Sequence, residues 1–325
     1  MTSEMVDPGT AVTQGGASRR IALQQLMLPA VLLVLVVVGT IDDHEVFFTK
    51  DNLLLVLTQA SIVGVIALGM TFVIATGGID LSVGSVLAAA AIAGGQFADT
   101  GSWAFIAGTI GFAVFLGAFN GVAIAYGRIV PFIATLAMLT GARGLALWMS
   151  EKTPISVNAL EAVRWLGREQ FLGIQVPVWI FAIASVSAWI LLNRTVYGRR
   201  VIAVGGNREA ARIAGIRPER IVFSVYVLTG LCAGISAVML SGRLGSASPV
   251  AGGLLELDAI AAVVIGGTSL AGGRATIVGT CLGVLTFALI FNLLNQFGLS
   301  ADLQQITKAL IVLGAALVQR GDLRR

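Results

Sequence analysis

The sequence predicts an all-α polytopic membrane protein with about ten transmembrane segments (eight to ten) and both termini in the cytoplasm. Of its 325 residues, 57% are hydrophobic and only 12% are charged. A soluble domain carries about twice that charged fraction, so this chain could not cover its surface with polar groups in water. The 40 glycines agree with this class, because glycine is commoner in membrane helices than in soluble ones.

A membrane-spanning helix needs about 20 mostly apolar residues. Ten candidate runs follow each other with short connections, at residues 24–41, 53–75, 81–96, 103–126, 131–149, 175–193, 220–241, 257–271, 276–296 and 302–319. The third and the eighth are short for a straight crossing, so either could be broken or partly re-entrant. We therefore expect one membrane domain over residues 23–319, flanked by a disordered tail at 1–22 and a short tail at 320–325.

Lysine and arginine set the predicted orientation, because loops rich in them stay in the cytoplasm. Residues 194–220 carry seven of the 21 basic residues, so we expect this loop in the cytoplasm. Both tails also carry arginines and lie on the same side when the number of crossings is even. The acidic segment 42–51 and the charge-balanced segment 150–174 then fall outside. The basic residues form no single stripe, which argues against nucleic-acid binding.

The first motif is TGGIDLSVGS, where two glycines interrupt a long apolar run and Asp80 and Ser82 open the next one. Asp and Ser are preferred at helix N-caps, because their oxygens accept the free N–H groups of the first turn. Irregular backbone at membrane depth is tolerated only where it is buried in protein or lines a water-filled cavity. Two interpretations of Asp80 stay open, a cap at the cytoplasmic interface or a residue that lines a ligand path.

A weak internal repeat accompanies this motif. The pattern GGxxLxxG occurs at 77–84 and again at 266–273, which places the two copies 189 positions apart. Transporters often carry such repeats, with the binding site near the repeat interface. In a chain this rich in glycine, chance explains eight matching positions nearly as well.

The second motif is GGNREAARIAGI, residues 205–216, inside the most basic loop. Asn207 suits an N-cap and Gly215 suits the left-handed position after a helix end, with Pro218 just beyond. The motif predicts about two helical turns, which are marginal alone and must dock on something. Its small apolar face consists of Ala210, Ala211, Ile213 and Ala214, flanked by Arg208 and Arg212. The pattern favours docking to a partner protein over a position in the lipid headgroup layer.

The last predicted span carries a polar face of Gln304, Gln305 and Lys308 at helical spacing. We expect the Lys308 ammonium to extend outward to the polar boundary, and a polar interior is the alternative. Three asparagines inside spans are expected to make hydrogen bonds between helices, and they are Asn120, Asn292 and Asn295.

The sequence lacks the motifs of catalysis and of nucleotide binding. GTSLAGGRAT at 267–276 resembles a phosphate loop, but a P-loop requires GxxxxGK[ST], so we expect no ATP site in this chain. The sequence has no nucleophile–base set, zinc-ligand spacing or dinucleotide fingerprint, which argues against a membrane enzyme. No predicted span contains histidine, and Asp80 is the only acid well inside the apolar pattern, which disfavours a proton-coupled secondary transporter.

Four blocks in order give the chain a resemblance to a known family. They are GMTFVIATGGIDLSVGSVLA at 69–88, NGVAIAYGRIVPFIATLAMLTGARGLA at 120–146, YGRRVIAVGGNREAARIAGI at 197–216 and LDAIAAVVIGGTSLAGGRATIVGT at 257–280. They resemble the ribose-type permeases, which are the membrane subunits of bacterial ABC importers of carbohydrates. The resemblance covers about residues 50–319.

The resemblance implies a multi-pass protein of the bacterial cytoplasmic (inner) membrane that does no covalent chemistry. It implies a second permease copy in a homodimer, a cytoplasmic ABC ATPase that binds ATP and Mg, and an extracytoplasmic sugar-binding protein. No cofactor or metal is expected in this chain. The coupling segment would contact the ATPase through Gly205, Asn207, Arg208, Glu209, Ala210, Ala211, Ala214 and Gly215, and Ala211→Asp is expected to abolish transport while leaving insertion intact.

The resemblance also implies that the region of the first motif borders the translocation path. The candidate path residues are Thr76, Gly77, Gly78, Asp80, Ser82, Gly84, Asn120, Gly266 and Gly267. The expected mechanism is alternating access driven by the separate ATPase, with a monosaccharide similar to ribose, xylose or galactose as cargo. A nucleoside or a branched-chain amino acid is the alternative cargo for the same machinery.

Overall fold

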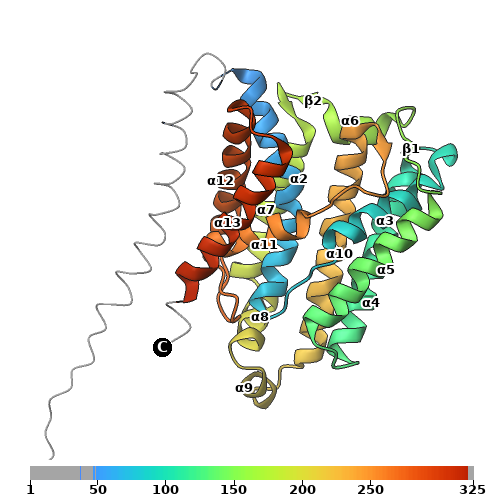
Figure 1. Ribbon diagram of the computed structural model, residues 1–325. Coiled ribbons are helices and arrows are strands. Elements are labelled where there is room, and N and C mark those ends of the chain that lie inside the picture. The colour runs from blue at the N-terminus through green and yellow to red at the C-terminus, as the bar shows by residue number, and fades with distance from the viewer. Residues whose placement is uncertain (1–36, 38–46, 48, 321–325) are drawn as a thin grey trace, which may run out of the picture.

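The computed structural model describes residues 37, 47 and 49–320, and these form a bundle of helices with a few two-residue strands (Figure 1). The first half contains α2 (Lys50–Ala75), α3 (Val83–Gly95), the short 3₁₀ helix η1 (Ala98–Thr100), α4 (Ser102–Ala125), α5 (Pro131–Met149), β1 (Ile155–Ser156), α6 (Glu161–Arg168), β2 (Gln170–Phe171) and β3 (Ile174–Gln175). Antiparallel pairs join β2 to β3, and β1 to β4 of the second half.

The second half contains α7 (Val176–Arg194), α8 (Val196–Gly206), α9 (Arg208–Ile213), α10 (Pro218–Leu244), β4 (Ser246–Ala247), α11 (Leu255–Ile265), α12 (Ile277–Gln296) and α13 (Ala301–Arg320). Helices α8 and α9 lie at one end of the bundle, called here the α9 end. Helix α6 and the strand pairs lie at the opposite end, called here the α6 end (Figure 1).

The predicted spans within the described residues all correspond to helices. Six of these are long and apolar enough to cross a membrane, namely α2, α4, α5, α7, α10 and α12. The two short segments are short in the structure as well, because α3 has 13 residues and α11 has 11. Helix α13 coincides with the last predicted span, whereas 24–41 and the tail 1–22 lie outside the described residues. The fold is therefore that of a polytopic all-α membrane protein.

Small residues allow the central helices to approach closely. Helix α10 packs on α4, α2, α6 and α3, and α2 packs on α12, α7 and α11. A Cβ atom added at Gly117 of α4 would lie 2.6 Å from the backbone oxygen of Tyr226 and 2.9 Å from the Cα of Gly230. Backbone packing at this distance requires glycine, and it brings the dispersion attraction that membrane helices need to associate.

Two segments enter the bundle as half-helices. All 13 residues of α3 are buried, and this helix begins only after a non-helical stretch at 76–82. Helix α11 likewise follows turns at 249–254. The two half-helices begin beside one another, because Gly84 at the start of α3 contacts the backbone of Gly252 just before α11.

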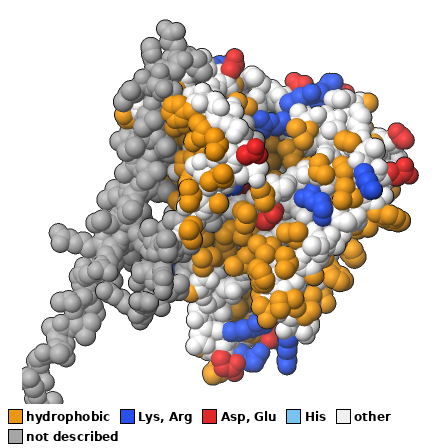
Figure 2. Space-filling model, in the orientation of Figure 1, with side chains coloured by type: hydrophobic (Ala, Val, Ile, Leu, Met, Phe, Trp, Pro, Cys, Tyr) orange, Lys and Arg blue, Asp and Glu red, His pale blue; other side chains and the backbone are white. Residues whose placement is uncertain are grey.

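The surface has the pattern of a membrane protein. Apolar side chains dominate the middle of the face in Figure 2, and charged side chains gather at the α9 end and along the α6 end. The seven arginines of segment 194–220 are all exposed, and they belong to the α9 end.

Candidate functional site

Helix α9, which lies in the arginine-rich segment 194–220, has the local structure that the sequence predicts. The Asn207 side chain accepts a hydrogen bond of 2.9 Å from the backbone N–H of Ala210, which caps the helix. Gly215 adopts a φ of +81°, and the backbone N–H of Ile216 returns to the Ala211 carbonyl oxygen at 3.0 Å. Free backbone groups at both ends of this six-residue helix thereby have hydrogen-bond partners.

A carboxylate on α10 holds α9 in place. Glu219 Oε1 lies 2.7 Å from an Arg212 nitrogen and 3.9 Å from an Arg208 nitrogen, and Arg212 also reaches Glu209 at 3.3 Å. Such partly exposed ion pairs each contribute little energy, but together they fix the orientation of α9 relative to α10. Helix α9 therefore projects from the end of the bundle and is held in a fixed orientation against α10.

The position of Ala211 corrects one prediction for the coupling segment, namely that this side chain contacts a partner. Its exposed fraction is only 4%, and it packs into the apolar cluster of its own chain that includes Val222 of α10. Ala211 therefore anchors α9 to the rest of its own chain. The exposed face consists of Arg208, Glu209, Ala210, Arg212, Ile213, Ala214 and Gly215, and Ile213 protrudes with 83% of its area exposed.

The first motif forms a closed polar cluster. Asp80 Oδ1 accepts hydrogen bonds from the backbone N–H of Ser82 at 2.9 Å and from its hydroxyl at 2.6 Å. The Asn120 amide of α4 donates to the same Ser82 oxygen at 2.9 Å. The Asp80 carboxylate therefore holds the turn 80–82 directly before α3, and Ser82 at the N-cap position makes no side-chain cap to that helix.

This cluster is tightly packed in the observed conformation. Asp80, Ser82 and Asn120 are 3%, 0% and 1% exposed. The gap beside Asp80 and Asn120 has no room for a water molecule. Tyr226 of α10 donates a hydrogen bond of 3.4 Å to the carbonyl oxygen of Ile79, which ties the turn to α10. Polar groups of the motif are thus satisfied within the protein, as irregular backbone in a membrane requires.

The glycine pairs end helices. Gly77 has a φ of +79° and closes α2, while Gly267 has a φ of +90° and closes α11. The following N–H returns five residues back in both cases, from Gly78 to the Val73 oxygen and from Thr268 to the Val263 oxygen. These caps correspond when Gly77 is matched with Gly267, one position beyond the match of 77 with 266 in the sequence pattern. The repeat thus has a structural counterpart, but its register differs by one residue.

The remaining candidates for the translocation path, Thr76, Gly77 and Gly266, contact the backbone of neighbouring segments or of their own helix. The Thr76 hydroxyl donates to the Val73 carbonyl oxygen at 2.8 Å. Gly77 and Gly205 lie against Gly272, where an added Cβ would be 2.9 Å from the Gly77 nitrogen and 2.8 Å from the Gly205 oxygen. Gly266 lies against the backbone of α12. The C-terminal ends of α2 and α8 therefore meet the loop that follows α11, and glycines form the contact.

The prediction that Lys308 extends outward is wrong. Its ammonium lies 2.6 Å from Asp258 Oδ1 and 4.7 Å from the ring centre of Phe291. The Lys308 and Asp258 side chains are 18% and 13% exposed, so the pair faces the interior. An ammonium that is withdrawn from water needs a counter-charge, and Asp258 on another helix supplies it.

Two acids of α11, Asp258 and Glu256, were not predicted as buried groups, and Glu256 is only 8% exposed. Asp80 is therefore not the only acid inside the apolar pattern. The signal was available in the string LELD at 255–258, which opens an apolar run with two acids and resembles the acidic first turn of a helix. The predicted span began at 257, so Glu256 fell outside it and Asp258, as its second residue, was not counted as an acid well inside the apolar run.

The expected hydrogen bonds between helices are confirmed for two asparagines. Asn120 binds Ser82 as described, and Asn292 of α12 forms a reciprocal amide pair with Asn52 of α2, at 2.6 Å and 3.2 Å. Asn295 is exposed near the end of α12.

Comparison with known proteins assigns the chain to a family. Residues 52–317 match the family model described as the permease component of a branched-chain amino acid transport system. The chain therefore belongs to this family of membrane transport permeases. It is 41% identical to the ribose import permease protein RbsC of Escherichia coli K12 over 91% of this chain and 93% of the relative.

Two further relatives extend this picture. The ribose import permease protein RbsC of Bacillus subtilis 168 is 45% identical over 89% of this chain and 90% of its own length. The xylose transport system permease protein XylH of Escherichia coli K12 is 31% identical, with 96% of both chains covered. No solved structure matches the chain.

Proposed function

We propose that the chain is the membrane-spanning permease subunit of an ABC importer that takes up a monosaccharide of the ribose, xylose or galactose type. A binding protein outside the cytoplasmic membrane delivers the sugar, and a separate cytoplasmic ATPase, which binds ATP and Mg, drives alternating access. The observation that carries this proposal is the structure of α9. This helix is capped, it is held against α10, and its Ile213 side chain is 83% exposed at the α9 end of the bundle. The similarity to ribose and xylose permeases supports the cargo.

The contacts of α9 support its role as a lever. Glu219 joins α9 to the first turn of α10 through two arginines, and Ala211 packs against α10. Helix α10 in turn packs on α4 and α2, and its Tyr226 binds the turn before α3 at Ile79. A displacement of α9 by an ATPase would therefore pass along α10 to the interrupted segment at 76–82. Two permease copies would form a homodimer, with one ATPase on each α9.

Ten crossings fit the dimensions of the chain. The 13 residues of α3 extend about 20 Å, and the preceding non-helical residues 76–82 add up to about 20 Å, against a hydrocarbon core of about 30 Å. The turns at 249–254 precede α11 in the same way as residues 76–82 precede α3, and this second segment runs in the opposite direction. With the α9 end in the cytoplasm, these segments each cross once. The predicted span 24–41, which lies outside the described residues, would supply the tenth crossing and place both termini inside.

The family description and the relatives name different cargoes. The description names branched-chain amino acids, whereas the relatives above are ribose and xylose permeases. A ligand screen on the binding protein that co-purifies with this chain decides between them. We expect tight binding of a pentose or hexose, and tight binding of leucine or of a nucleoside without sugar binding would overturn the choice of cargo.

An ion-coupled secondary transporter is the rival from another class. The buried acids of α11 remove one argument against it, so the family membership and the form of α9 carry the choice. The test is affinity purification of the chain from native membranes in mild detergent, with mass spectrometry of its partners and sugar uptake in vesicles. We expect an ABC ATPase to co-purify and uptake to require ATP. Uptake by the chain alone, driven by an ion gradient, would refute the proposal.

A further inference from the structure

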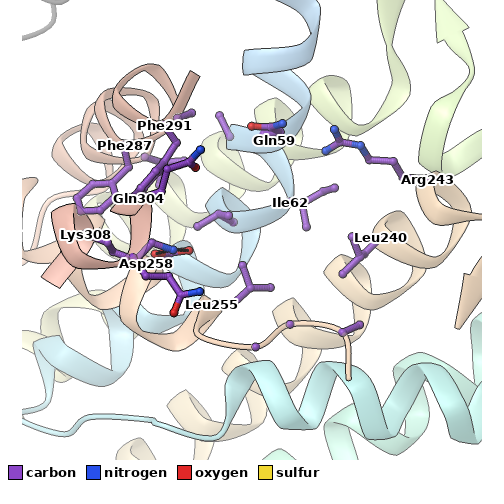
Figure 3. Close-up of a pocket in the computed structure, with 18 of the residues that line it drawn as sticks. Gln59, Ile62, Leu240, Arg243, Leu255, Asp258, Phe287, Phe291, Gln304 and Lys308 are labelled. Carbon is purple, nitrogen blue, oxygen red and sulfur yellow. Dashed lines mark hydrogen bonds and ion pairs between the residues drawn. The ribbon is translucent and has the colours of Figure 1, made fainter. Parts of the chain in front are cut away.

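A cavity of about 530 Å³ lies between α2, α10, α11, α12 and α13 (Figure 3). Its wall is mostly apolar, with Ile62 of α2, Leu240 of α10 and Phe287 and Phe291 of α12 among the lining residues. The volume lies in the range of sites for small molecules, about 300–1,000 Å³.

The polar groups of the cavity converge from several helices. The Asp258–Lys308 pair lies on one side, with the Lys308 ammonium over the Phe291 ring. Gln59 of α2 and Gln304 of α13 add amide groups, as Figure 3 shows. Donors and acceptors thus stand beside aromatic and aliphatic surface, the combination that a site needs to orient a small polar ligand.

The charge balance favours an uncharged ligand at this pair. Asp258 and Lys308 neutralise each other at 2.6 Å, so a charged solute would have to break this pair to gain a counter-charge from either of its members. A hydroxyl group both donates and accepts, so it can bind the carboxylate, the ammonium or an amide without breaking the pair. Arg243 on the α10 wall, drawn apart from the pair in Figure 3, adds further hydrogen-bond donors. The C–H face of a sugar ring would pack on Phe291.

The cavity ends at the interrupted segment before α11. Residues 251–253 line it, and Arg143 of α5 holds that segment with hydrogen bonds of 2.7 Å to the Pro249 oxygen and 2.9 Å to the Ala251 oxygen. On its other side, Gly252 lies against Gly84 at the start of α3. A ligand in the cavity would therefore adjoin the two half-helices whose movement the lever from α9 would produce.

We propose that this cavity is a transient subsite for the transported sugar, in which the Asp258–Lys308 pair and the neighbouring glutamines bind its hydroxyl groups and Phe291 packs on its ring. The inference rests on the proposed function and adds a position and a recognition chemistry to it. The candidates of the first motif are not part of this subsite, because none of them lines this cavity, and the gap beside Asp80 and Asn120 has no room for a water molecule.

The test uses the full complex in proteoliposomes, with the co-purifying ATPase and binding protein, and measures uptake of radiolabelled ribose or xylose together with ATP hydrolysis. In Phe291→Leu the wall stays apolar but loses its ring. In the double variant Asp258→Asn with Lys308→Gln, the pair becomes uncharged and keeps hydrogen-bonding groups. For both we expect uptake at low sugar to fall about tenfold, the effect of one good hydrogen bond or ring contact, while the ATPase stimulated by the binding protein persists.

Matched controls make the outcome decisive. Phe115→Leu changes a phenylalanine that is 60% exposed on α4, outside the cavity, and should leave uptake and ATP hydrolysis unchanged. If the double variant does not assemble, Phe291→Leu decides alone. Wild-type uptake per ATP in Phe291→Leu would overturn the subsite while leaving the importer intact. Absence of ATP-dependent sugar uptake by the wild-type complex would instead refute the proposed function.

Discussion

Replacing Ile213 by aspartate tests whether α9 is the contact with the ATPase. The side chain is 83% exposed, so the chain's own fold loses almost nothing when it changes. Burying an isoleucine in a partner's groove contributes about 1.5–3 kcal/mol, which corresponds to about a 10- to 150-fold difference in affinity. A carboxylate in that groove adds a desolvation cost, so the loss should reach the upper end of this range.

The assay is co-purification of the ATPase with the tagged permease, followed by titration of purified ATPase onto the permease in detergent. Leu172→Asp is a matched control, because Leu172 is 77% exposed in the β2–β3 turn at the opposite end. Leu172 has a positive φ of 54°, which aspartate tolerates better than most residues. Wild-type ATPase affinity of the Ile213→Asp permease would refute the assignment of α9.

Ala211→Asp is a different perturbation. The side chain is 4% exposed within its own chain, so a carboxylate there would unseat α9 from α10. We expect loss of ATPase binding together with a lower thermal stability, whereas Ile213→Asp should lose binding at unchanged stability. Equal stability of Ala211→Asp and wild type would contradict the packing of α9.

Three further predictions concern the thermal stability of the purified chain. Gly117→Leu should cost about 1–3 kcal/mol or more, because its Cβ would meet α10 backbone at 2.6 Å, whereas Gly111→Leu on the same helix has no atom within 4 Å of its Cβ and should be neutral. Asn292→Leu should cost about 1–3 kcal/mol by leaving Asn52 without its reciprocal amide, and the double change to leucine should cost less than the sum of the singles. Arg143→Gln should cost about 1.5–3 kcal/mol for each hydrogen bond to a carbonyl oxygen that it removes, and a stability equal to wild type would mean that other residues hold the segment before α11.

Local chemistry made α9 predictable. Its cap at Asn207 and its left-handed glycine at Gly215 act within a few residues, so both follow from the sequence. The direction of its faces did not follow, because only the position of α10 decides that Ala211 is buried and Ile213 is exposed. A helix of six residues carries too little periodicity to show which side meets its own chain.

Long-range pairing explains the other differences. The sequence shows Lys308 as one cation near the start of an apolar run, where extension toward water is the ordinary outcome. Its partner Asp258 lies 50 positions away on another helix, and only packing brings the two within 2.6 Å. The cavity beside them has the same origin, because its walls come from five helices.

Composition and hydropathy determined that this protein spans a membrane, since the cost of apolar groups in water and of charges in lipid depends on residue type alone. Glycine pairs and caps determined where α2, α9 and α11 end, since those rules are local. The tertiary structure decided which buried acid meets which cation, that the Asp80 turn is closed by Asn120 and Tyr226, and that the two half-helices begin side by side. These outcomes depend on contacts between residues far apart in the chain, which no local pattern encodes.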